Sequence, residues 1–506
     1  MAWRNGIEQV RAATLARLPE LVRRRRLPPV GRFTGAGLRI GAALALWALR
    51  ERGRGQAISR TGLSHRLRGA FEKLGPAYIK LGQIVSSGRG LFPEELVAEF
   101  RSLRDKVPPE PFSEVRRVVE AELGRPLAEV FERFDETCLA SASIAQVHAA
   151  RLRSGEEVVV KVQRGSVERL VARDIRAMAW IAPFLVGRIP IAALANPPAL
   201  VELFAETISE ELDFRLEAEN MLDIARVLRD SGSAVVIVPR PHPALVTRRM
   251  LVMERLEGWN YEEAEAMRAA GIDTAAVLRA LMISFLEGAM IYGVFHGDLH
   301  GGNLFVMRDG RVALLDFGMT GRMDEKQRLA FLRMMVTGAM NDVRGQLAAF
   351  RDLGAMPEDA DLEALIRVLK ADQAPRDPTL MSGEELVDEI QGMLKGLLAH
   401  GARLPKHLML YVKNMIFLDG AIAQLAPDLD LFAEVTRIWG YFASQHGERI
   451  ARELGFDPGL AAIDLTGMKA SLGLTSDVES LTHRELLARR EKVRERLEEA
   501  GAAPRS

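Results

Sequence analysis

The stretch His296-Gly297-Asp298-Leu299-His300-Gly301-Gly302-Asn303, with Asp316-Phe317-Gly318 beginning thirteen residues after its last asparagine, decides how this chain folds. It offers a carboxylate, an amide and a second carboxylate, the groups that hold a nucleotide phosphate and its metal. The apolar run Val312-Ala313-Leu314-Leu315 predicts a strand that would fix the position of Asp316. Two unrelated turns are the alternative, since Asp, Gly, His and Asn are common turn residues. Because both motifs occur in this order, we favour a phosphoryl-transfer site.

The spacing within the first motif is that of a kinase catalytic loop. Asn303 follows Asp298 by five residues, and in such a loop the Asp faces the acceptor while the Asn faces the metal. We therefore expect Asp298 to orient an acceptor hydroxyl or a water molecule, and Asn303 and Asp316 to hold Mg²⁺. His300 either contacts a phosphate or braces the loop, and we leave it outside the predicted site.

Lys161 is the expected phosphate-binding lysine. It lies in the apolar run Glu157–Val162, which is predicted to be a strand. A buried lysine needs a paired acid, and a kinase pairs its strand lysine with a helix glutamate beside the α- and β-phosphates. Glu211 and Glu217, on a helix predicted at about residues 200–230, are both candidates, and the sequence does not choose between them. An edge-strand lysine that points to water is the alternative.

The loop before this lysine departs from an ordinary protein kinase, because no Gly-x-Gly-x-x-Gly precedes Lys161. Residues 140–145 are rich in Ala and Ser, whose small side chains still allow a phosphate to approach, although Ala restricts the backbone more than Gly does. A strand end further along would present the backbone of Glu254 and Leu256 to adenine. The predicted phosphate-facing residues of the loop are Ala140, Ser141, Ala142 and Ser143.

Two absences argue against regulation through a phosphorylated activation loop. No Ala-Pro-Glu follows Gly318, and a helix is expected soon after Met323. Gly297 precedes Asp298 where a protein kinase carries the arginine that binds the activation-loop phosphate.

The composition is that of a globular protein with two or three domains. The 506 residues are 48% hydrophobic and 27% charged, and too numerous for a single core. Lys+Arg and Asp+Glu both number 68, so no overall charge favours nucleic acid. The balance hides a basic N-terminus, since residues 1–60 contain 13 Arg and only three acids. The single cysteine, Cys138, excludes an intrachain disulfide and a cysteine-cluster metal site.

No segment is predicted to span a membrane, and no cleavable signal peptide is expected. The apolar stretches 35–49, 177–195 and 410–425 are short or interrupted by charges and prolines. The basic N-terminus, with Arg23 to Arg26 among aromatic residues (Trp3, Phe33 and Trp47), would suit an anionic lipid surface. A solvated basic face is the alternative.

The order of the predicted elements gives a small mixed β lobe followed by a large helical lobe. Helices are expected over 61–107 and over Phe112–Leu123, the latter capped by Ser113 and ended by Gly124. Strands are expected from Val130 onward, with a hairpin turn at Ser154-Gly155. The remaining expectations are strands at 235–238 and 245–254, mainly helix from about 261, and a charged helix at about 483–500.

These residues together resemble the UbiB family of atypical kinase-like proteins, also called the ABC/AarF/ADCK-type kinases. The resemblance spans roughly residues 60–430. Its distinctive parts are a Lys-x-Gly-Gln motif before the β lobe and the Ala-rich loop, neither of which ordinary kinases have. The residues that match are Lys80, Gly82 and Gln83, the loop 140–148, Lys161, Glu211-Leu212-Asp213, Glu217, Asp298, Asn303 and Asp316-Phe317-Gly318.

The resemblance implies an α+β, bilobal protein-kinase-like fold with an added N-terminal helical extension. That extension would cover the cleft and set Lys80 and Gln83, as catalytic residues, against Glu211 and Asp213. Such a cover would obstruct a protein substrate and leave ATPase or small-molecule phosphotransfer chemistry with ATP and Mg²⁺. The implied domains are a basic, membrane-peripheral segment over 1–60, a helical extension over 61–112, an N-lobe over 113–256, a helical C-lobe over 257–470, and a charged C-terminal helix and tail over 471–506.

The resemblance also implies a role in the biosynthesis of ubiquinone or another isoprenoid quinone. The partners would be an isoprenoid lipid or quinone precursor, an anionic membrane surface, other quinone-biosynthesis proteins and a second copy in a homodimer. Some bacterial relatives end in transmembrane helices, whereas residues 476–506 here predict a charged helix and tail. We therefore expect a cytoplasmic protein attached peripherally to the inner face of the cell membrane. An aminoglycoside-kinase-like phosphotransferase and a nucleotide-gated lipid-binding protein with little turnover are the alternatives.

Overall fold

The computed structural model divides the chain into two compact units, which we describe separately. Unit 1 contains residues Met1–Asp223, Val238–Glu257 and Leu315–Met319, and unit 2 contains Ile224–Ile237, Gly258–Leu314 and Thr320–Ser506. The structure describes residues 1–23, 32–51, 56–86, 94–101, 103, 108–185, 197–370, 377–382, 405–455 and 463–502, with scattered positions between 385 and 402. The predicted basic run at Arg24–Arg26 and the apolar stretch beyond residue 185 lie outside the described residues.

Unit 1 contains a five-stranded antiparallel sheet in the order β1-β2-β3-β6-β5. The predicted hairpin at Ser154-Gly155 is confirmed, with Gly155 at φ 88°, a value that glycine adopts without steric cost. The predicted strand 245–254 is wrong as a single element, because the chain reverses between Val246 and Met250. The strands are β1 (Phe131–Ser141), β2 (Ala145–Leu152), β3 (Glu157–Gln163), β5 (Pro241–Val246) and β6 (Met250–Glu254).

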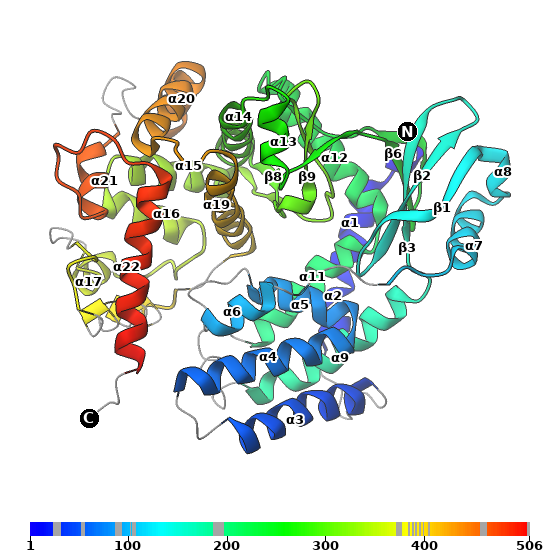
Figure 1. Ribbon diagram of the computed structural model, residues 1–506, viewed down its shortest axis with the longest axis horizontal. Helices are drawn as coiled ribbons and strands as arrows, with labels where there is room; N and C mark the ends of the chain where they lie inside the picture. The colour runs from blue at the N-terminus through cyan, green and yellow to red at the C-terminus, as the bar shows by residue number, and fades with distance from the viewer. Residues whose placement is uncertain are drawn as a thin grey trace. The chain divides into compact units, whose positions relative to one another are not determined.

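Helix α7 (Phe112–Leu123) covers one face of this sheet (Figure 1). Alternate residues of β3, namely Val158, Val160 and Val162, are buried in a core with α7, so Lys161 points to the opposite face. Gly124 ends α7 in a left-handed conformation as predicted. The predicted Ser113 cap is wrong, because Pro111 occupies the cap position.

The rest of unit 1 is helical and is built on a second core. The helix predicted at 200–230 is two helices separated by Leu212-Asp213, and Asp213 accepts a hydrogen bond from the N–H of Arg215 at the start of the second. The helices are η1 (Ala2–Arg4), α1 (Ile7–Ala16), α2 (Leu18–Val22), α3 (Arg32–Arg50), α4 (Gln56–Leu74), α5 (Pro76–Ser86), α6 (Glu94–Arg101), α8 (Leu127–Val130), α9 (Val167–Leu185), α11 (Pro197–Glu211) and α12 (Phe214–Asp230).

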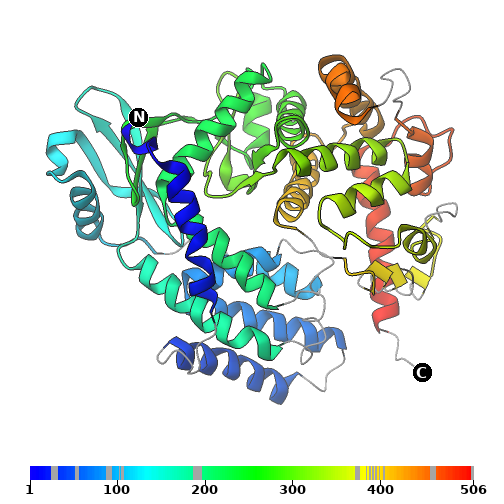
Figure 2. The ribbon, with the colours of Figure 1, turned by 180° about the vertical axis from the view of Figure 1, so that it is seen from behind.

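Helices α3, α4, α5, α9 and α11 form a stacked layer in unit 1 (Figure 1). The buried residues Tyr78 of α5, Ile175 of α9 and Phe204 of α11 belong to one core, which Ala36 of α3 also joins. Helix α1 runs along α11 (Figure 2). The N-terminal helices are therefore an integral part of unit 1, packed on the segment that leads to α12.

Unit 2 is mainly helical, with two small sheets in the orders β4-β10-β9-β7 and β11-β8. The strands are β4 (Val236–Ile237), β7 (Gly258–Asn260), β8 (Val294–His296), β9 (Leu304–Met307), β10 (Val312–Leu314) and β11 (Thr320–Arg322). The helices are α13 (Ala264–Ala269), α14 (Thr274–Glu287), η2 (Gly288–Tyr292), η3 (Gly301–Asn303), α15 (Glu325–Ala339), α16 (Val343–Asp352), α17 (Leu362–Val368), α19 (Lys406–Leu425), α20 (Leu431–Leu454), α21 (Leu465–Ser471) and α22 (His483–Ala502).

The predictions for this half are largely confirmed. A strand precedes Asp316, a helix capped by Asp324 starts just after Met323, and a charged helix begins at His483. With these elements, the predicted α+β class is confirmed. In the described part of the chain, two helices are long and apolar enough to cross a membrane, Thr274–Tyr292 and Lys406–Leu425. They pack against each other within unit 2, as core helices of a globular domain do.

Gly82, the glycine of the Lys-x-Gly-Gln motif, lies where α5 meets the end of α6. A methyl group on Gly82 would come within 2.2 Å of the buried Leu103 side chain and 3.3 Å of Phe100. We predict that Gly82→Ala lowers the free energy of unfolding by about 1–3 kcal/mol, the usual cost of overpacking. Gly69→Ala is the matched control: this α4 glycine has open space around it, so the same change should stabilise by about 0.5–1 kcal/mol. Chemical denaturation measures both, and equal effects would contradict the packing argument.

Candidate nucleotide site and catalytic loop

Lys161 of β3 is buried in unit 1 between two carboxylates. Its Nζ lies 2.7 Å from Glu217 Oε1 and 3.2 Å from Asp316 Oδ2. Glu217 of α12 is therefore the partner acid that the sequence left open. The Lys161 side chain is 13% exposed and that of Glu217 3%, whereas the Asp316 side chain is 49% exposed. The lysine thus joins one buried acid to one that faces solvent.

The charges of this cluster support one another. Burial by itself lowers the pKa of Lys161, but the charges of Asp316 and Glu217 outweigh burial, so the net effect is a raised pKa. Burial raises the pKa of Glu217 above its usual value, against the opposing charge of Lys161. The Lys161 ammonium also lies 5.4 Å from the centre of the Phe214 ring, a favourable cation–π distance. The cluster therefore keeps Lys161 charged in a largely apolar setting.

Helix α12 also holds the segment that carries Asp316. Glu217 Oε1 accepts a hydrogen bond from the Phe317 N–H at 3.3 Å, and Asn220 donates one to the Phe317 carbonyl at 2.8 Å. Asp316 has φ 54°, a left-handed conformation that Asp and Asn adopt more readily than most residues. Both backbone groups of Phe317 are thereby fixed by one helix, which determines where the Asp316 carboxylate points.

The Lys-x-Gly-Gln helix reaches the same segment through Glu211. Lys80 of α5 forms a 2.9 Å ion pair with Glu211, and both side chains are about nine-tenths buried. A methyl group on Gly318 would lie 3.1 Å from Glu211 Cγ, so this ion pair sits directly beside Gly318. Asp213 does not share in the pairing, because its carboxylate forms a two-bonded contact with Arg215 at 3.0 and 2.7 Å. The structure therefore contains the implied contact between Lys80 and Glu211, and the role of Asp213 stays a prediction.

The Ala-rich loop joins β1 to β2 as a tight connection. The Ala142 N–H donates to the Ala145 carbonyl at 2.8 Å, so this amide is not free to bind a phosphate. Arg164 donates to the Ala142 carbonyl at 3.0 Å and to the Ser141 hydroxyl at 2.7 Å. Ser143 is buried at 3% exposure. Arg164 thus holds the loop in one conformation, whereas a glycine-rich loop would be flexible. Ala140 and Ser141 are the last residues of β1.

The proposed adenine-facing end of β6 is partly occupied within unit 1. The Glu254 N–H donates to the Arg240 carbonyl at 2.9 Å, so only the other backbone groups of Glu254 and Leu256 are candidates for a base.

In unit 2, the predicted catalytic loop is held by α19. Asp298 forms a close ion pair with Lys413. The Asp298 side chain is 16% exposed and the Lys413 side chain 20%. The next residue of α19, Asn414, is fully buried; it accepts from the Leu299 N–H at 2.9 Å and donates to the His296 carbonyl. A helix more than a hundred residues away in sequence therefore sets both the backbone and the charge of the Asp298 loop.

The loop is also braced from within. Asn303 donates from its amide to the Asp298 carbonyl at 3.0 Å and is 6% exposed. His296 Nδ1 accepts from the Asp298 N–H, and His300 Nδ1 accepts from the Gly302 N–H, both at 3.1 Å. His300 is therefore a brace for the loop.

Four residues that shape these sites were not among the predicted site residues. Asn220 follows Glu217 by three residues, which places both on one helix face, so the spacing could have indicated that Asn220 belongs to the site. Arg164 directly follows the strand of Lys161, and this position is a weaker indication. Lys413 and Asn414 carried no local signal, because their partners lie far away in sequence.

Oxygen donors dominate the unit 1 cluster, which suits a hard cation. No group of three or more His, Cys, Asp or Glu side chains with metal-site geometry occurs among the described residues. Mg²⁺ commonly uses one or two carboxylates together with phosphate oxygens and does not need such a group. The half-exposed Asp316 carboxylate meets that requirement.

The chain is similar to known atypical kinase-like proteins. The family model of the ABC1 atypical kinase-like domain matches residues 102–349. An uncharacterized protein of Mycobacterium tuberculosis is 38% identical over 385 residues, covering 74% of this chain and 77% of the relative.

The chain belongs to the ABC1 atypical kinase-like family.

Two further relatives carry more informative names. An Arabidopsis thaliana chloroplastic protein named as an uncharacterized aarF domain-containing protein kinase is 32% identical, covering 73% of each chain. A probable protein kinase UbiB of Aeromonas hydrophila is 30% identical, covering 74% of this chain and 69% of the relative. The predicted resemblance to the UbiB/AarF group and the kinase-like fold are thus confirmed.

Removal of Lys161 tests the buried cluster. We predict that Lys161→Met lowers the free energy of unfolding by about 3–5 kcal/mol at neutral pH, because Glu217 is left buried without its cation. The loss should be smaller at acidic pH. The acid in question is Glu217, whose pKa is raised in the folded state. Such an acid contributes stability at low pH, where it is protonated, and this contribution is lost as the pH rises through its folded-state pKa.

Denaturant unfolding at about pH 5 and about pH 8 would measure this difference. The double variant Lys161→Met/Glu217→Gln is the control, since it removes the buried charge and should recover most of the loss at the higher pH. An equal loss at both pH values, with no recovery in the double variant, would show that Glu217 is not an unpaired buried charge in Lys161→Met.

Proposed function

We propose that the protein binds Mg-ATP and acts as an ATPase or as a phosphotransferase on a small molecule or lipid. The observation that carries this proposal is the buried Lys161, held charged by Glu217 and linked to the solvent-facing Asp316. Lys161 would bind the α- and β-phosphates, and Asp316 with Asn303 would hold Mg²⁺. The metal would neutralise charge that develops on the phosphate oxygens.

The residues of this chain would position the reactants. Glu217 keeps Lys161 charged and aligned, and Asn220 keeps the Asp316 segment in place. Asp298 would orient the acceptor hydroxyl or water and take up its proton. Lys413, which pairs with Asp298, would keep the carboxylate oriented until an acceptor arrives. Lys80 and Glu211, beside Gly318, would restrict access to the Asp316 segment, which favours a small acceptor over a protein.

The biological setting is proposed from the family. Relatives named UbiB suggest a role in making ubiquinone or another isoprenoid quinone. Helix α3 would supply a peripheral contact with an anionic membrane, because its apolar residues Leu38 and Leu49 are 74% and 83% exposed. Arg39 and Arg50 lie on the same helix. An isoprenoid lipid or quinone precursor, other quinone-biosynthesis proteins and a second copy of the chain are the proposed partners, at the inner face of the cell membrane.

Two alternatives use the same residues. An aminoglycoside-kinase-like enzyme would share the Asp298 loop, but the Lys80–Glu211 pair beside Gly318 argues against it. A nucleotide-gated lipid-binding protein would bind Mg-ATP with little turnover. ATP hydrolysis measured with and without anionic liposomes separates this last alternative from an ATPase. A nucleotide-gated lipid-binding protein should bind the liposomes but hydrolyse little ATP.

Asp316→Asn tests the metal role. Asn keeps the size of the side chain and tolerates the left-handed backbone at this position. We predict that Mg²⁺-dependent ATP affinity falls by more than about tenfold, because even residues that support metal ligands contribute about 10–100-fold. Asp309→Asn, at an exposed turn, is the control and should bind ATP normally. Unchanged ATP affinity and hydrolysis in Asp316→Asn would refute the assigned site.

Lys413→Met tests the catalytic loop separately from nucleotide binding. We predict that ATP affinity is retained while turnover falls by about 10²–10⁴-fold, the usual contribution of a positioned acid or base. Lys413→Arg keeps the charge beside Asp298 and should retain more activity than Lys413→Met. If turnover is the same in Lys413→Met as in the unmodified protein, Lys413 has no part in positioning Asp298.

A further inference from the structure

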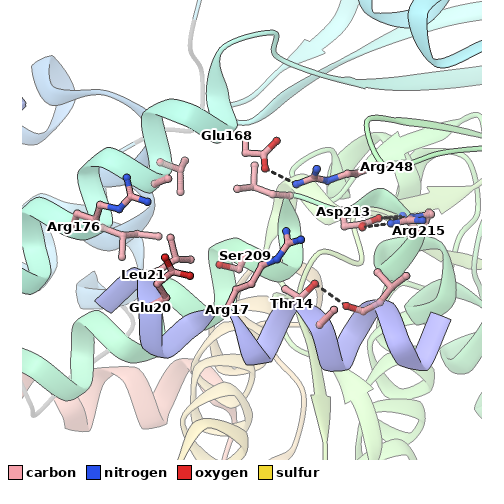
Figure 3. Close-up of a pocket in the computed structure, with 16 residues that line it drawn as sticks. Thr14, Arg17, Glu20, Leu21, Glu168, Arg176, Ser209, Asp213, Arg215 and Arg248 are labelled. Carbon is pink, nitrogen blue, oxygen red and sulfur yellow. Dashed lines mark hydrogen bonds and ion pairs between the residues drawn. The ribbon is translucent and has the colours of Figure 1, made fainter. Parts of the chain in front are cut away.

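The N-terminal segment, residues 1–17, packs against the elements that lead into α12. Helix η1 lies against β5, and α1 lies against α11. Thr14 of α1 lines one pocket of unit 1 together with Asp213 and Arg215 at the start of α12 (Figure 3). The segment lies outside residues 102–349, so its contacts are not part of the domain that the ABC1 family model matches.

Arg4 is the counter-charge of a carboxylate that is buried on α12. Its guanidinium donates two hydrogen bonds to Glu219, from Nε to Oε2 at 2.8 Å and from Nη2 to Oε1 at 2.7 Å. The Glu219 side chain is 6% exposed, whereas that of Arg4 is 43% exposed. In the described part of the chain, no other group donates a hydrogen bond to the Glu219 carboxylate. A buried carboxylate is costly without a paired cation, so Glu219 keeps Arg4 at this face of α12.

Arg4 and Lys161 hold α12 from different sides. Glu217 and Glu219 are two residues apart, which places their side chains about 200° apart around the helix axis. Glu217 pairs with Lys161 of β3, and Glu219 pairs with Arg4. A helix that is paired on one side can rotate about that pairing, whereas pairing on two nearly opposite sides fixes its rotation.

The rotation of α12 determines where the Asp316 segment lies. Glu217 accepts a hydrogen bond from the Phe317 N–H, and Asn220 donates one to the Phe317 carbonyl. Arg11 of α1 approaches the same amide, with 3.4 Å between its Nη2 and Asn220 Oδ1. A rotation of the helix would move both partners of Phe317 together, and with them the neighbouring Asp316.

We propose that Arg4 is a positioning residue of the nucleotide site, with Arg11 in support. It acts through Glu219: by fixing the rotation of α12, it keeps Lys161 paired and Asp316 in place. In a kinase the Lys–Glu pair and the metal-binding Asp must both be in place, so a residue that sets both controls the affinity for nucleotide. This inference rests on the proposed Mg-ATP site and extends it to a residue that touches neither nucleotide nor metal.

The test uses a variant that removes the pairing without leaving a buried charge unpaired. Glu219→Gln loses the ion pair but places a neutral amide in the buried position, and Arg4 is exposed enough to stay hydrated. Arg4→Gln and Arg4→Lys change the other partner, and the lysine keeps the charge but loses the fork of donors. The matched controls are Glu8→Gln and Arg17→Gln, which change exposed residues of the same N-terminal segment.

Three measurements are made on each full-length variant. Hydrogen exchange followed by mass spectrometry, without nucleotide, reports how firmly residues 315–319 and α12 are held. Calorimetric titration gives the affinity for Mg-ATP, and a thermal melt gives the overall stability.

We expect Glu219→Gln to melt close to the unmodified protein. Its residues 315–319 should exchange about 2–30-fold faster and its Mg-ATP affinity should fall about 2–30-fold, the usual effect of a substitution on the coupling between two sites. Arg4→Gln should show the same losses together with a lower melting temperature, because Glu219 is left without its cation. Arg4→Lys should recover part of both, and the two controls should behave like the unmodified protein.

The proposal is overturned if Glu219→Gln exchanges residues 315–319 and binds Mg-ATP like Glu8→Gln. Exchange that becomes equally faster in β3 and α7 would also overturn it, because the contact would then stabilise the fold without setting one site. The exchange comparison needs no nucleotide. If the unmodified protein bound no Mg-ATP, the proposed function would be contradicted, and exchange alone would still decide whether Arg4 positions the Asp316 segment.

Discussion

The burial of Lys161 is the constraint on which the candidate nucleotide site depends. A lysine on the inner face of an apolar strand is tolerated only because Glu217 meets it at 2.7 Å. That requirement places α12 across the sheet. The same helix then fixes Phe317 through Glu217 and Asn220, so the position of Asp316 follows from the pairing of the lysine. The buried charge of Lys161 thus connects β3, α12 and the segment that carries Asp316.

The N-terminal helices extend this arrangement. Lys80 is buried against Glu211, which lies beside Gly318, so the helical extension contacts the segment that carries Asp316. Arg4 forms two hydrogen bonds of 2.8 and 2.7 Å with Glu219 of α12. The N-terminal segment of the chain therefore also contacts α12, the helix that pairs with Lys161. These contacts would hold the elements of the proposed nucleotide site in place.

Much of this could be predicted from the sequence, for identifiable reasons. The hairpin before Lys161, the strand before Asp316 and the spacing from Asp298 to Asn303 are local patterns, which a single sequence reveals. The break between α11 and α12 was missed because Leu212-Asp213 contains neither Gly nor Pro. The choice of Glu217 over Glu211, and the pairing of Lys413 with Asp298, depend on tertiary contacts that no local pattern encodes.

The most direct test of the central claim is whether the unmodified protein binds ATP through a metal. Calorimetric titration with ATP would be carried out once with Mg²⁺ and once with a chelator in its place. If Lys161 and Asp316 form a metal–nucleotide site, saturable binding is expected with Mg²⁺, and its loss or strong weakening is expected with the chelator. Equal binding under both conditions, or no binding with Mg²⁺, would contradict the account.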